Sequence, residues 1–291
     1  KGEVVVLAAS ACSSARILLN SKSKQHPNGL GNSSDLVGKY LHDSTGGDMM
    51  AFIPELIDRK TYNEDGVGGM HVYSPWWLDN KNLDFARGYH IEVWGGLGAP
   101  SYGTGFNVNS FNKFFGLNKA GGYGNVLRSD MKKYYGSTIG LSGRGESIAQ
   151  KTNYCEIDPK KVDKFGVPVL RFNYKWTENE IKQAKHMQDT FEEVIHNMNA
   201  IPMWNKPGKE SNYGINKPGL IIHEVGTTRM GNDPKNSVVN QYEQLHDVPN
   251  VFVVDAGPFV SQADKNPTWT IMALAWRSSE YIIDQLKKQN I

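Results

Sequence analysis

The amino-acid sequence predicts a mixed α/β fold, and three observations carry this prediction. A short apolar run over residues 4–9 leads directly into a helix-like segment over 10–19, which is typical of a buried strand followed by a helix. Apolar and polar residues alternate over 168–176, which predicts a strand with one buried face. Residues 177–180 form a capping box, and apolar residues then recur at three to four positions up to Met198, which predicts a long amphipathic helix.

The remaining elements follow along the chain. Residues 46–57 form an apolar run that predicts a strand, and 137–176 read as β-structure with a turn at Asp158-Pro159. Residues 251–254 predict a second buried strand, and Pro267 opens a final helix that extends to about residue 286. A buried first strand needs neighbouring strands, so we expect this part of the chain to dock on a sheet formed elsewhere.

Composition excludes several classes of protein. The 291 residues include 32 Lys+Arg and 30 Asp+Glu, and a net charge of +2 is too small for a protein that acts mainly by binding nucleic-acid phosphates. No apolar run approaches the roughly 20 residues that a membrane-spanning helix needs, so we expect no integral membrane protein. Two cysteines exclude a disulfide scaffold for a chain of this size.

Glycine and aromatic residues are concentrated in one stretch. Residues 88–124 contain ten of the 30 glycines, interleaved with aromatic side chains, and Trp76-Trp77 precede them. This composition is typical either of loops with a small satellite core or of the wall or lid of a ligand cavity. The sequence leaves both interpretations open.

The sequence contains few of the common chemical motifs. The sequence has no complete G-x-G-x-x-G, no phosphate-binding loop and no His or Cys pair at metal-ligand spacing, so we expect no metal site. Among the eight histidines, His223 differs because it follows the apolar run 220–222 and precedes a Gly-Thr-Thr turn. This pattern predicts an imidazole at the end of a strand, where active sites of open sheets gather.

The last part of the chain carries a specific set of motifs. They are His223-x-x-Gly226-Thr227-x-Arg229-Met230-Gly231, Asp255-Ala256 after the predicted strand 251–254, and Asn266-Pro267-Thr268 before the final helix. The set closely resembles the C-terminal signature of the glucose–methanol–choline (GMC) flavin oxidoreductases, and within that family the bacterial sugar, gluconate and glycoside dehydrogenases. Residues 1–45 resemble a mid-chain segment of the same family.

The resemblance implies a domain organisation. It implies the C-terminal part of an FAD-binding Rossmann-like domain together with a substrate domain that has an antiparallel sheet and flanking helices. We expect residues 1–45 and 216–291 to belong to the flavin domain and 46–215 to form the substrate domain. Because the family's dinucleotide fingerprint is missing, we expect the N-terminal flavin-binding half to be a separate chain or not captured in this sequence.

The resemblance also implies an activity. Family members oxidise the CH–OH group of a sugar, glycoside or polyol to a carbonyl, with the hydride passing to flavin N5. His223 would accept the hydroxyl proton, because an imidazole titrates near neutral pH. Asn266 would hold the substrate oxygen, since an amide is no base at this pH. Asp255 and Ala256, with the backbone of Asn266, Pro267 and Thr268, would contact the FAD.

The expected partners follow from the same branch. They are a sugar or glycoside substrate, and a small subunit with a cytochrome or another non-oxygen electron acceptor, in the periplasm. The alternative is a non-catalytic substrate-binding or scaffold chain that pairs with a separate flavin-carrying chain. A carbohydrate-binding module is a third possibility, but it needs neither His223 nor Asn266. Arg229 is interpreted as a structural residue of its loop.

Overall fold

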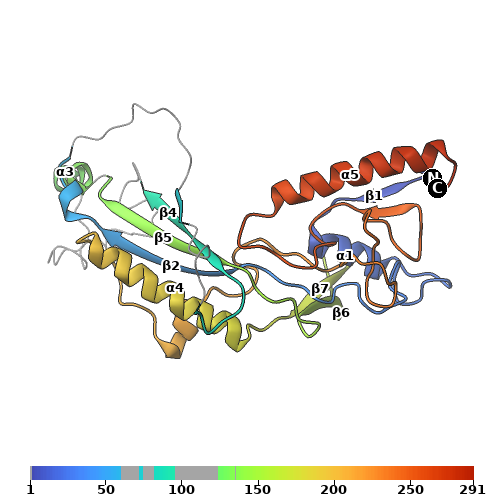
Figure 1. Ribbon diagram of the computed structural model, residues 1–291, viewed down its shortest axis with the longest axis horizontal. Helices are drawn as coiled ribbons and strands as arrows, with labels where there is room; N and C mark the ends of the chain where they lie inside the picture. The colour runs from blue at the N-terminus through green and yellow to red at the C-terminus, as the bar shows by residue number, and fades with distance from the viewer. Residues whose placement is uncertain (1, 60–71, 75–81, 96–123, 135) are drawn as a thin grey trace. The chain divides into compact units, whose positions relative to one another are not determined.

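The computed structural model describes residues 2–59, 72–74, 82–95, 124–134 and 136–291 (Figure 1). Trp76-Trp77 and most of the glycine-rich stretch lie outside these residues, so the structure does not bear on either interpretation of them. The chain forms two compact units. The first contains residues 1–44, 146–177 and 217–291, and the second contains 45–145 and 178–216.

The first unit is built around a two-stranded parallel sheet. Strand β1 (Val5–Leu7) pairs with β9 (Val251–Val253), so that Val6 lies opposite Phe252. Both predicted strands are present. The prediction that β1 is buried was wrong, since Val5 is 43% and Val6 is 51% exposed. Strand β9 is fully buried, because it has β1 on one side and the core of the unit beneath it.

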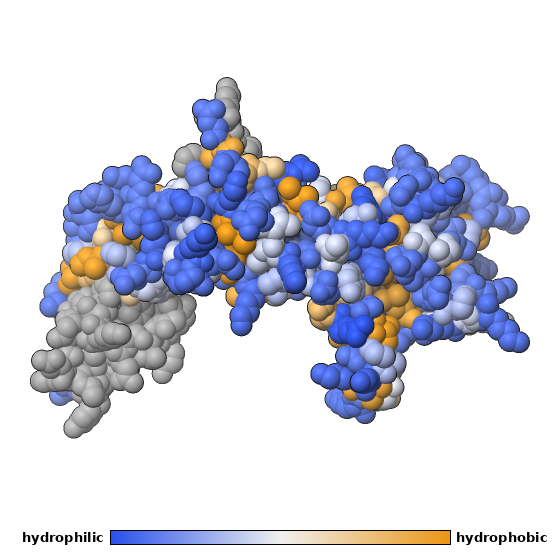
Figure 2. All heavy atoms as spheres, turned by 90° about the horizontal axis from the view of Figure 1, so that it is seen from below, coloured by the Kyte–Doolittle hydropathy of each residue, from blue (hydrophilic) through white to orange (hydrophobic). Residues whose placement is uncertain are grey.

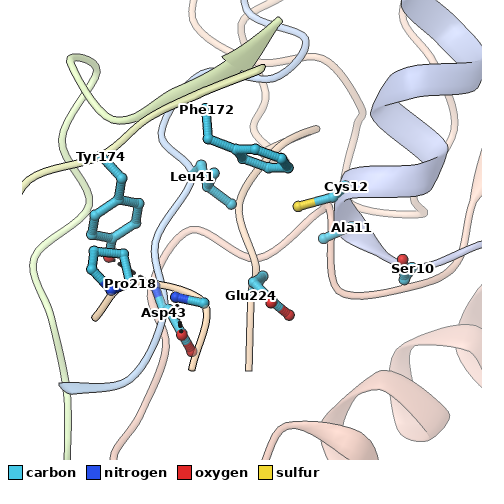
Figure 3. A pocket seen from close by; sticks show the side chains of 10 residues that line it. Ser10, Ala11, Cys12, Leu41, Asp43, Phe172, Tyr174, Pro218 and Glu224 are labelled. Atoms are coloured by element: carbon cyan, nitrogen blue, oxygen red, sulfur yellow. Dashed lines mark hydrogen bonds between the residues drawn. The ribbon is translucent and has the colours of Figure 1, made fainter. Parts of the chain in front are cut away.

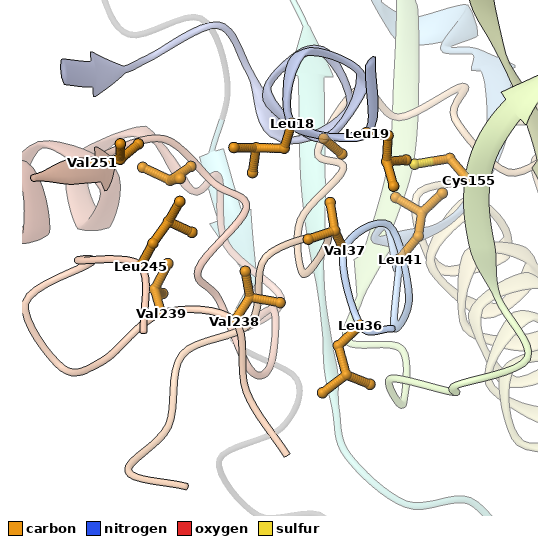
Figure 4. Packing of buried hydrophobic residues seen from close by; sticks show 12 residues of the cluster. Leu18, Leu19, Leu36, Val37, Leu41, Cys155, Val238, Val239, Leu245 and Val251 are labelled. Carbon is orange, nitrogen blue, oxygen red and sulfur yellow. The ribbon is translucent and has the colours of Figure 1, made fainter. Parts of the chain in front are cut away.

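Helix α1 (Ala11–Asn20) supplies the centre of the hydrophobic core of this unit. Leu18 packs in one cluster with residues that come from distant parts of the chain (Figure 4). Gly38 makes a close approach possible in this cluster, because its φ is +85° and a Cβ there would collide with the backbone carbonyl of Cys155. The buried members are Ala15, Leu18, Leu19, Leu36, Val37, Leu41, Cys155, Val238, Val239, Leu245, Val251 and Val253.

A β-hairpin packs against α1. It consists of β6 (Tyr154–Val162) and β7 (Pro168–Asn173), and Arg16 of α1 binds both the Asp163 carboxylate at 2.7 Å and the Pro168 carbonyl at 2.8 Å. Residues 146–177 therefore belong to the first compact unit, although they lie within the range 46–215 expected for the substrate domain. The difference arises because the apolar side chains of the hairpin pack on α1, a contact that sequence order does not reveal.

The hairpin also corrects two local predictions. The predicted turn at Asp158-Pro159 lies inside β6, where the register shifts between Ile157 and Val162. Proline has no N–H to donate to the neighbouring strand, and it is tolerated here because the regular pattern of hydrogen bonds is interrupted at such an irregularity. Strand β7 does not bury one alternating face, since its last three residues, including Phe172, are all exposed.

The second unit is an antiparallel sheet with a helix against it. The strand order is β3-β4-β5-β2-β8, and α4 (Glu178–Asn197) contacts β2 and β5 (Figure 1). Met187 and Phe191 of α4 are fully buried against Met49, Tyr89 and Leu141 of the strands, so the apolar stripe predicted for this helix is confirmed. The strands are β2 (Thr45–Phe52), β3 (Val72–Ser74), β4 (Tyr89–Gly95), β5 (Thr138–Gly145) and β8 (Ile201–Pro202).

The other helices are short, with one exception. Helix α3 (Gly124–Tyr134) and the 3-10 segments η1 (Pro54–Leu56) and η3 (Lys209–Gly214) belong to the second unit, while α5 (Thr268–Lys287) belongs to the first. Figure 2 shows mainly hydrophilic side chains on one face, interrupted by separate hydrophobic patches. Among the described residues, no helix combines the length and the apolarity that crossing a membrane would need.

Candidate active site

His223 lies in an irregular segment and not at the end of a strand as predicted. Residues 217–220 form a turn that is closed by the Leu220 N–H and the Lys217 carbonyl at 3.1 Å. Ile222 has a φ of +61°, which a strand residue does not adopt, and both Leu220 and Ile222 are exposed. The run 220–222 is therefore not a buried strand: Ile221 is buried, whereas Leu220 and Ile222 on either side of it are exposed.

The His223 backbone and ring are both bound to the segment that precedes β2. The His223 N–H donates to Asp43 Oδ1 at 3.0 Å, and His223 Nδ1 lies 3.3 Å from the hydroxyl of Ser44. Val225 then forms an antiparallel bridge with His42. Asp43 and Ser44 were not identified from the sequence. The signal that could have found them is an uninterrupted polar run, residues 42–45, directly after Leu41, where burial requires partners.

Asp43 carries an unusual carboxyl group. Burial, followed by repulsion from Glu224, raises its pKa to about 6, although the N–H groups of His223, Ser44 and Gly219 donate to it and act in the opposite direction. The largest cause is desolvation, which penalises the ionised form. A carboxyl group with a pKa raised to about 6 therefore accepts the backbone N–H of His223.

The glycine-threonine motif after His223 runs beside the segment that follows β9. The N–H groups of Gly226, Thr228 and Met230 donate to the carbonyls of residues 256, 257 and 258 at 3.1, 2.9 and 2.8 Å. Gly226 has a φ of +95°, and a Cβ there would collide with the Tyr40 carbonyl, so a side chain is excluded. Two motifs separated by about 30 residues are thus brought together by backbone hydrogen bonds.

Arg229 of the same motif makes a structural contact. Its guanidinium carbon lies 4.1 Å from the centroid of the Tyr40 ring. Such a cation–π contact ties the loop of residues 226–231 to the segment around Gly38. The arrangement agrees with the interpretation of Arg229 as a residue of the loop framework.

Asp255 and Ala256 lie just beyond β9 and contact α1. Asp255 is buried, its Oδ2 accepts the Ser14 hydroxyl at 2.5 Å, and its Oδ1 accepts the Gly257 N–H at 2.8 Å. Burial raises the pKa of this carboxyl group, and these hydrogen bonds oppose the rise. Ala256 packs with Ala11 and Val225 in a small apolar cluster. The expected contact of both residues with a cofactor stays a prediction, and the cap of the following turn is observed.

The N-terminal end of α5 is open. Asn266 and Thr268 are exposed, Pro267 is buried, and the helix begins at Thr268, one residue after the predicted start. The N-cap residue Pro267 forms no side-chain cap hydrogen bond. The backbone N–H groups of the first turn and the positive end of the helix dipole therefore suit an anionic group.

Gln262 connects this region with His223. The buried Gln262 side-chain amide donates to the Lys265 carbonyl at 3.2 Å and to the Ser44 hydroxyl oxygen at 3.5 Å. The loop that leads to Asn266 is therefore joined to His223 through the Ser44 hydroxyl. The described residues contain no cluster of three or more His, Cys, Asp or Glu side chains suited to a metal ion.

The chain is similar in sequence to known oxidoreductases. Residues 150–275 match the family model described as GMC oxidoreductase. The chain is 31% identical over 281 residues to a 2-methyl-1,2-propanediol dehydrogenase from Mycolicibacterium austroafricanum, covering 96% of this chain and 48% of the relative. It is also 31% identical over 169 residues to a gluconate 2-dehydrogenase flavoprotein from Pantoea cypripedii, covering 57% of this chain and 27% of the relative.

A solved structure agrees at the level of the fold. The structure of the formate oxidase of Aspergillus oryzae superimposes with a TM-score of 0.59 at 12% identity, covering 98% of this chain and 55% of that chain. The present chain spans about half the length of the propanediol dehydrogenase that it matches. The motifs around His223, Asp255 and Asn266, the family match and these relatives agree with one another: the chain carries the C-terminal domain of a GMC oxidoreductase and belongs to that family.

Proposed function

We propose that the protein containing this chain is an FAD-dependent dehydrogenase that oxidises the CH–OH group of a sugar, glycoside or polyol to a carbonyl. The observation that carries the proposal is the placement of His223, whose backbone and ring are both bound and whose partner Ser44 connects to the loop before Asn266. The names of the relatives support the substrate class, since one is a dehydrogenase of a diol and another a dehydrogenase of gluconate.

The residues present fit a flavin cofactor. Membership of the GMC oxidoreductase family, together with the flavoprotein relative, indicates FAD. The open N-terminal end of α5, with its uncapped N–H donors, suits the negative charge that a reduced flavin carries. The backbone at Asn266, Pro267 and Thr268 would hold the part of the flavin that carries this negative charge. Asp255 and Ala256 would contact another part of the cofactor. Bound FAD would supply the hydride acceptor.

The side chains of this chain would supply the remaining chemistry. His223 accepts the hydroxyl proton of the substrate, the general-base role for which histidine is the side chain most often used. Asn266 donates a hydrogen bond to the same oxygen and holds it toward His223. Ser44 fixes the ring of His223 through Nδ1. The described chain thus supplies a base and an orienting amide.

Substitution of His223 tests the proposal. In the full-length protein, His223→Ala should lower the rate of flavin reduction by a sugar or polyol by about 10²- to 10⁴-fold, the range for loss of a general base. Anaerobic stopped-flow absorption of the flavin measures this rate. The exposed His196 of α4 provides a matched control, and His196→Ala should leave the rate unchanged. Reduction at the normal rate in His223→Ala would contradict the mechanism.

The electron acceptor and partners belong to the same proposal. We expect electrons to pass to a cytochrome or another non-oxygen acceptor, with a small subunit and a periplasmic location. Purified protein should show the visible absorption of oxidised flavin and should reduce an artificial one-electron acceptor faster than it consumes oxygen. A purified complete protein without bound flavin would favour a non-catalytic scaffold chain that pairs with a flavin-carrying chain.

A further inference from the structure

Asp43 lies where three segments of the first unit meet. Its side chain is 1% exposed, and its Oδ1 accepts the backbone N–H groups of Ser44 at 2.8 Å and His223 at 3.0 Å. Its Oδ2 accepts the N–H of Gly219 at 3.0 Å. Figure 3 shows this carboxylate beside Tyr174 and Pro218 at the wall of a cavity of about 370 Å³. One carboxylate therefore binds the chain at Gly219, within the turn of residues 217–220, and again at His223.

The Asp43 backbone is held as firmly as its side chain. Its N–H donates to the Tyr174 hydroxyl at 3.0 Å, and its carbonyl accepts the Ser147 hydroxyl at 2.7 Å. The preceding residue, His42, exchanges two backbone hydrogen bonds with Val225, at 3.1 and 2.9 Å. The His223 backbone is thus fixed from Asp43 on one side and from the His42–Val225 bridge on the other.

Ser44 acts on the His223 ring. Its buried hydroxyl oxygen lies 3.3 Å from His223 Nδ1 and 3.5 Å from the Gln262 amide nitrogen. The amide nitrogen can only donate, so it occupies one lone pair of the hydroxyl oxygen. The second lone pair can accept a proton from Nδ1, and this is the arrangement that fits His223 as a base acting through Nε2. A ring that carries its proton on Nδ1 has its basic lone pair on Nε2, where it can accept a proton.

We propose that Asp43 and Ser44 are positioning residues for His223, Asp43 by holding its backbone N–H and Ser44 by setting its ring tautomer. The proposal rests on the proposed role of His223 as the base. It gives the buried Asp43–Ser44 pair a purpose beyond satisfying local hydrogen bonds: the three N–H groups that converge on Asp43 come from residues 44, 219 and 223, and the third belongs to the base itself.

The experiment reads the imidazole directly. Full-length protein is prepared with isotope-labelled histidine, and the His223 signals are assigned by their loss in His223→Gln. In the unsubstituted protein we expect one set of His223 signals with the proton on Nδ1. In Asp43→Asn we expect these signals to shift or broaden, because the new side-chain NH₂ group must face one of the three backbone N–H groups. Ser44→Ala should leave the backbone bonds intact and abolish the single tautomer.

Kinetics supply a second readout. Asp43→Asn should lower kcat by about 10- to 100-fold with a much smaller change of KM, since a small displacement of a reacting group is costly. Asp163→Asn is the matched control, because Asp163 also accepts two backbone N–H groups, those of Phe165 and Val167, at the far end of the β6–β7 hairpin. It should leave the His223 signals and kcat unchanged.

Each outcome decides between supporting and overturning the proposal. Folded Asp43→Asn protein with unchanged His223 signals would overturn the role of Asp43. If Asp43→Asn does not fold, Ser44→Ala carries the test, and an unchanged tautomer there overturns the proposal. The two proposals remain separable: a normal rate of flavin reduction in His223→Ala removes the base, whereas the His223 signals report on positioning in either case.

Discussion

Helices α4 and α5 have the same length of 20 residues and are packed in different ways. Helix α4 buries eight residues, among them Met187, Phe191 and Ile195, in the core of the second unit. Helix α5 buries only Ser278, and it leaves Trp269 88% and Trp276 72% exposed. One helix is held by an apolar stripe and the other mainly by polar and aromatic contacts.

The contacts of α5 are few and specific. Ser278 donates to the Glu243 carboxylate at 2.7 Å, and Tyr281 stacks on Tyr242 with ring centroids 3.9 Å apart. The outward face carries apolar side chains, which is typical of a helix that is covered on more than one side. An apolar helical pattern therefore predicts that a helix forms, but it does not identify the surface that packs against the helix.

The largest expected effect comes from α4. Phe191→Ala should lower the free energy of unfolding by about 3–5 kcal/mol, because it opens a cavity in a closed core. Urea denaturation of the protein measures the loss. Glu193→Ala, on the exposed face of the same helix, should change the stability by less than about 0.5 kcal/mol. A small effect of Phe191→Ala would contradict the packing of α4.

The second effect is a pH dependence at α5. Burial raises the pKa of Glu243 to about 7, although the Ser278 hydrogen bond and the Arg277 charge oppose the rise. The folded protein therefore keeps a proton that the unfolded chain releases, so stability falls as pH rises from about 4.5 to about 7. The loss should be on the order of 3 kcal/mol.

Glu243→Gln isolates this contribution from those of Asp43 and Asp255. Unfolding midpoints of the variant and the unsubstituted protein are compared at pH 5 and pH 8. The variant should lose less stability over this range than the unsubstituted protein loses. Equal losses in the two proteins would show that Glu243 does not titrate as its burial predicts.

A smaller effect is expected from Ser278. Ser278→Ala removes the hydrogen bond to the Glu243 carboxylate and should cost about 1–3 kcal/mol of unfolding free energy. Ser279→Ala is the matched control, since the exposed Ser279 hydroxyl donates to the Ala275 carbonyl of its own helix. Thermal unfolding at one pH compares the two variants, and equal midpoints would argue against the polar anchor of α5.

The smallest effect is expected at the exposed face of α5. The Trp276 indole N–H donates to Glu280 at 2.8 Å, and little else covers the ring. Trp276→Ala should therefore change the unfolding free energy by less than about 0.5 kcal/mol. A loss as large as that of Phe191→Ala would break the comparison, because it would mean that this face of α5 is covered in the protein.

Local patterns in the sequence determined most of the elements. The period of the apolar stripe predicts α4, and the Asn-Pro-Thr start predicts α5 to within one residue. The runs at 4–9 and 251–254 predict the paired strands β1 and β9. The motif around His223 indicated the family, and the match over residues 150–275 confirms it. These features depend on spacing along the chain, which the sequence displays directly.

Tertiary structure decided the partners of these elements. Packing left β1 exposed beside the buried β9 and placed residues 146–177 in the first unit. It also left Leu220 and Ile222 exposed on either side of the buried Ile221. It also placed Asp43 and Ser44 at His223, about 180 residues away in the sequence. Hydrogen bonds and packing between distant segments depend on which surfaces meet. No local period records that information. The sequence could therefore single out His223, but it could not identify the residues that hold it.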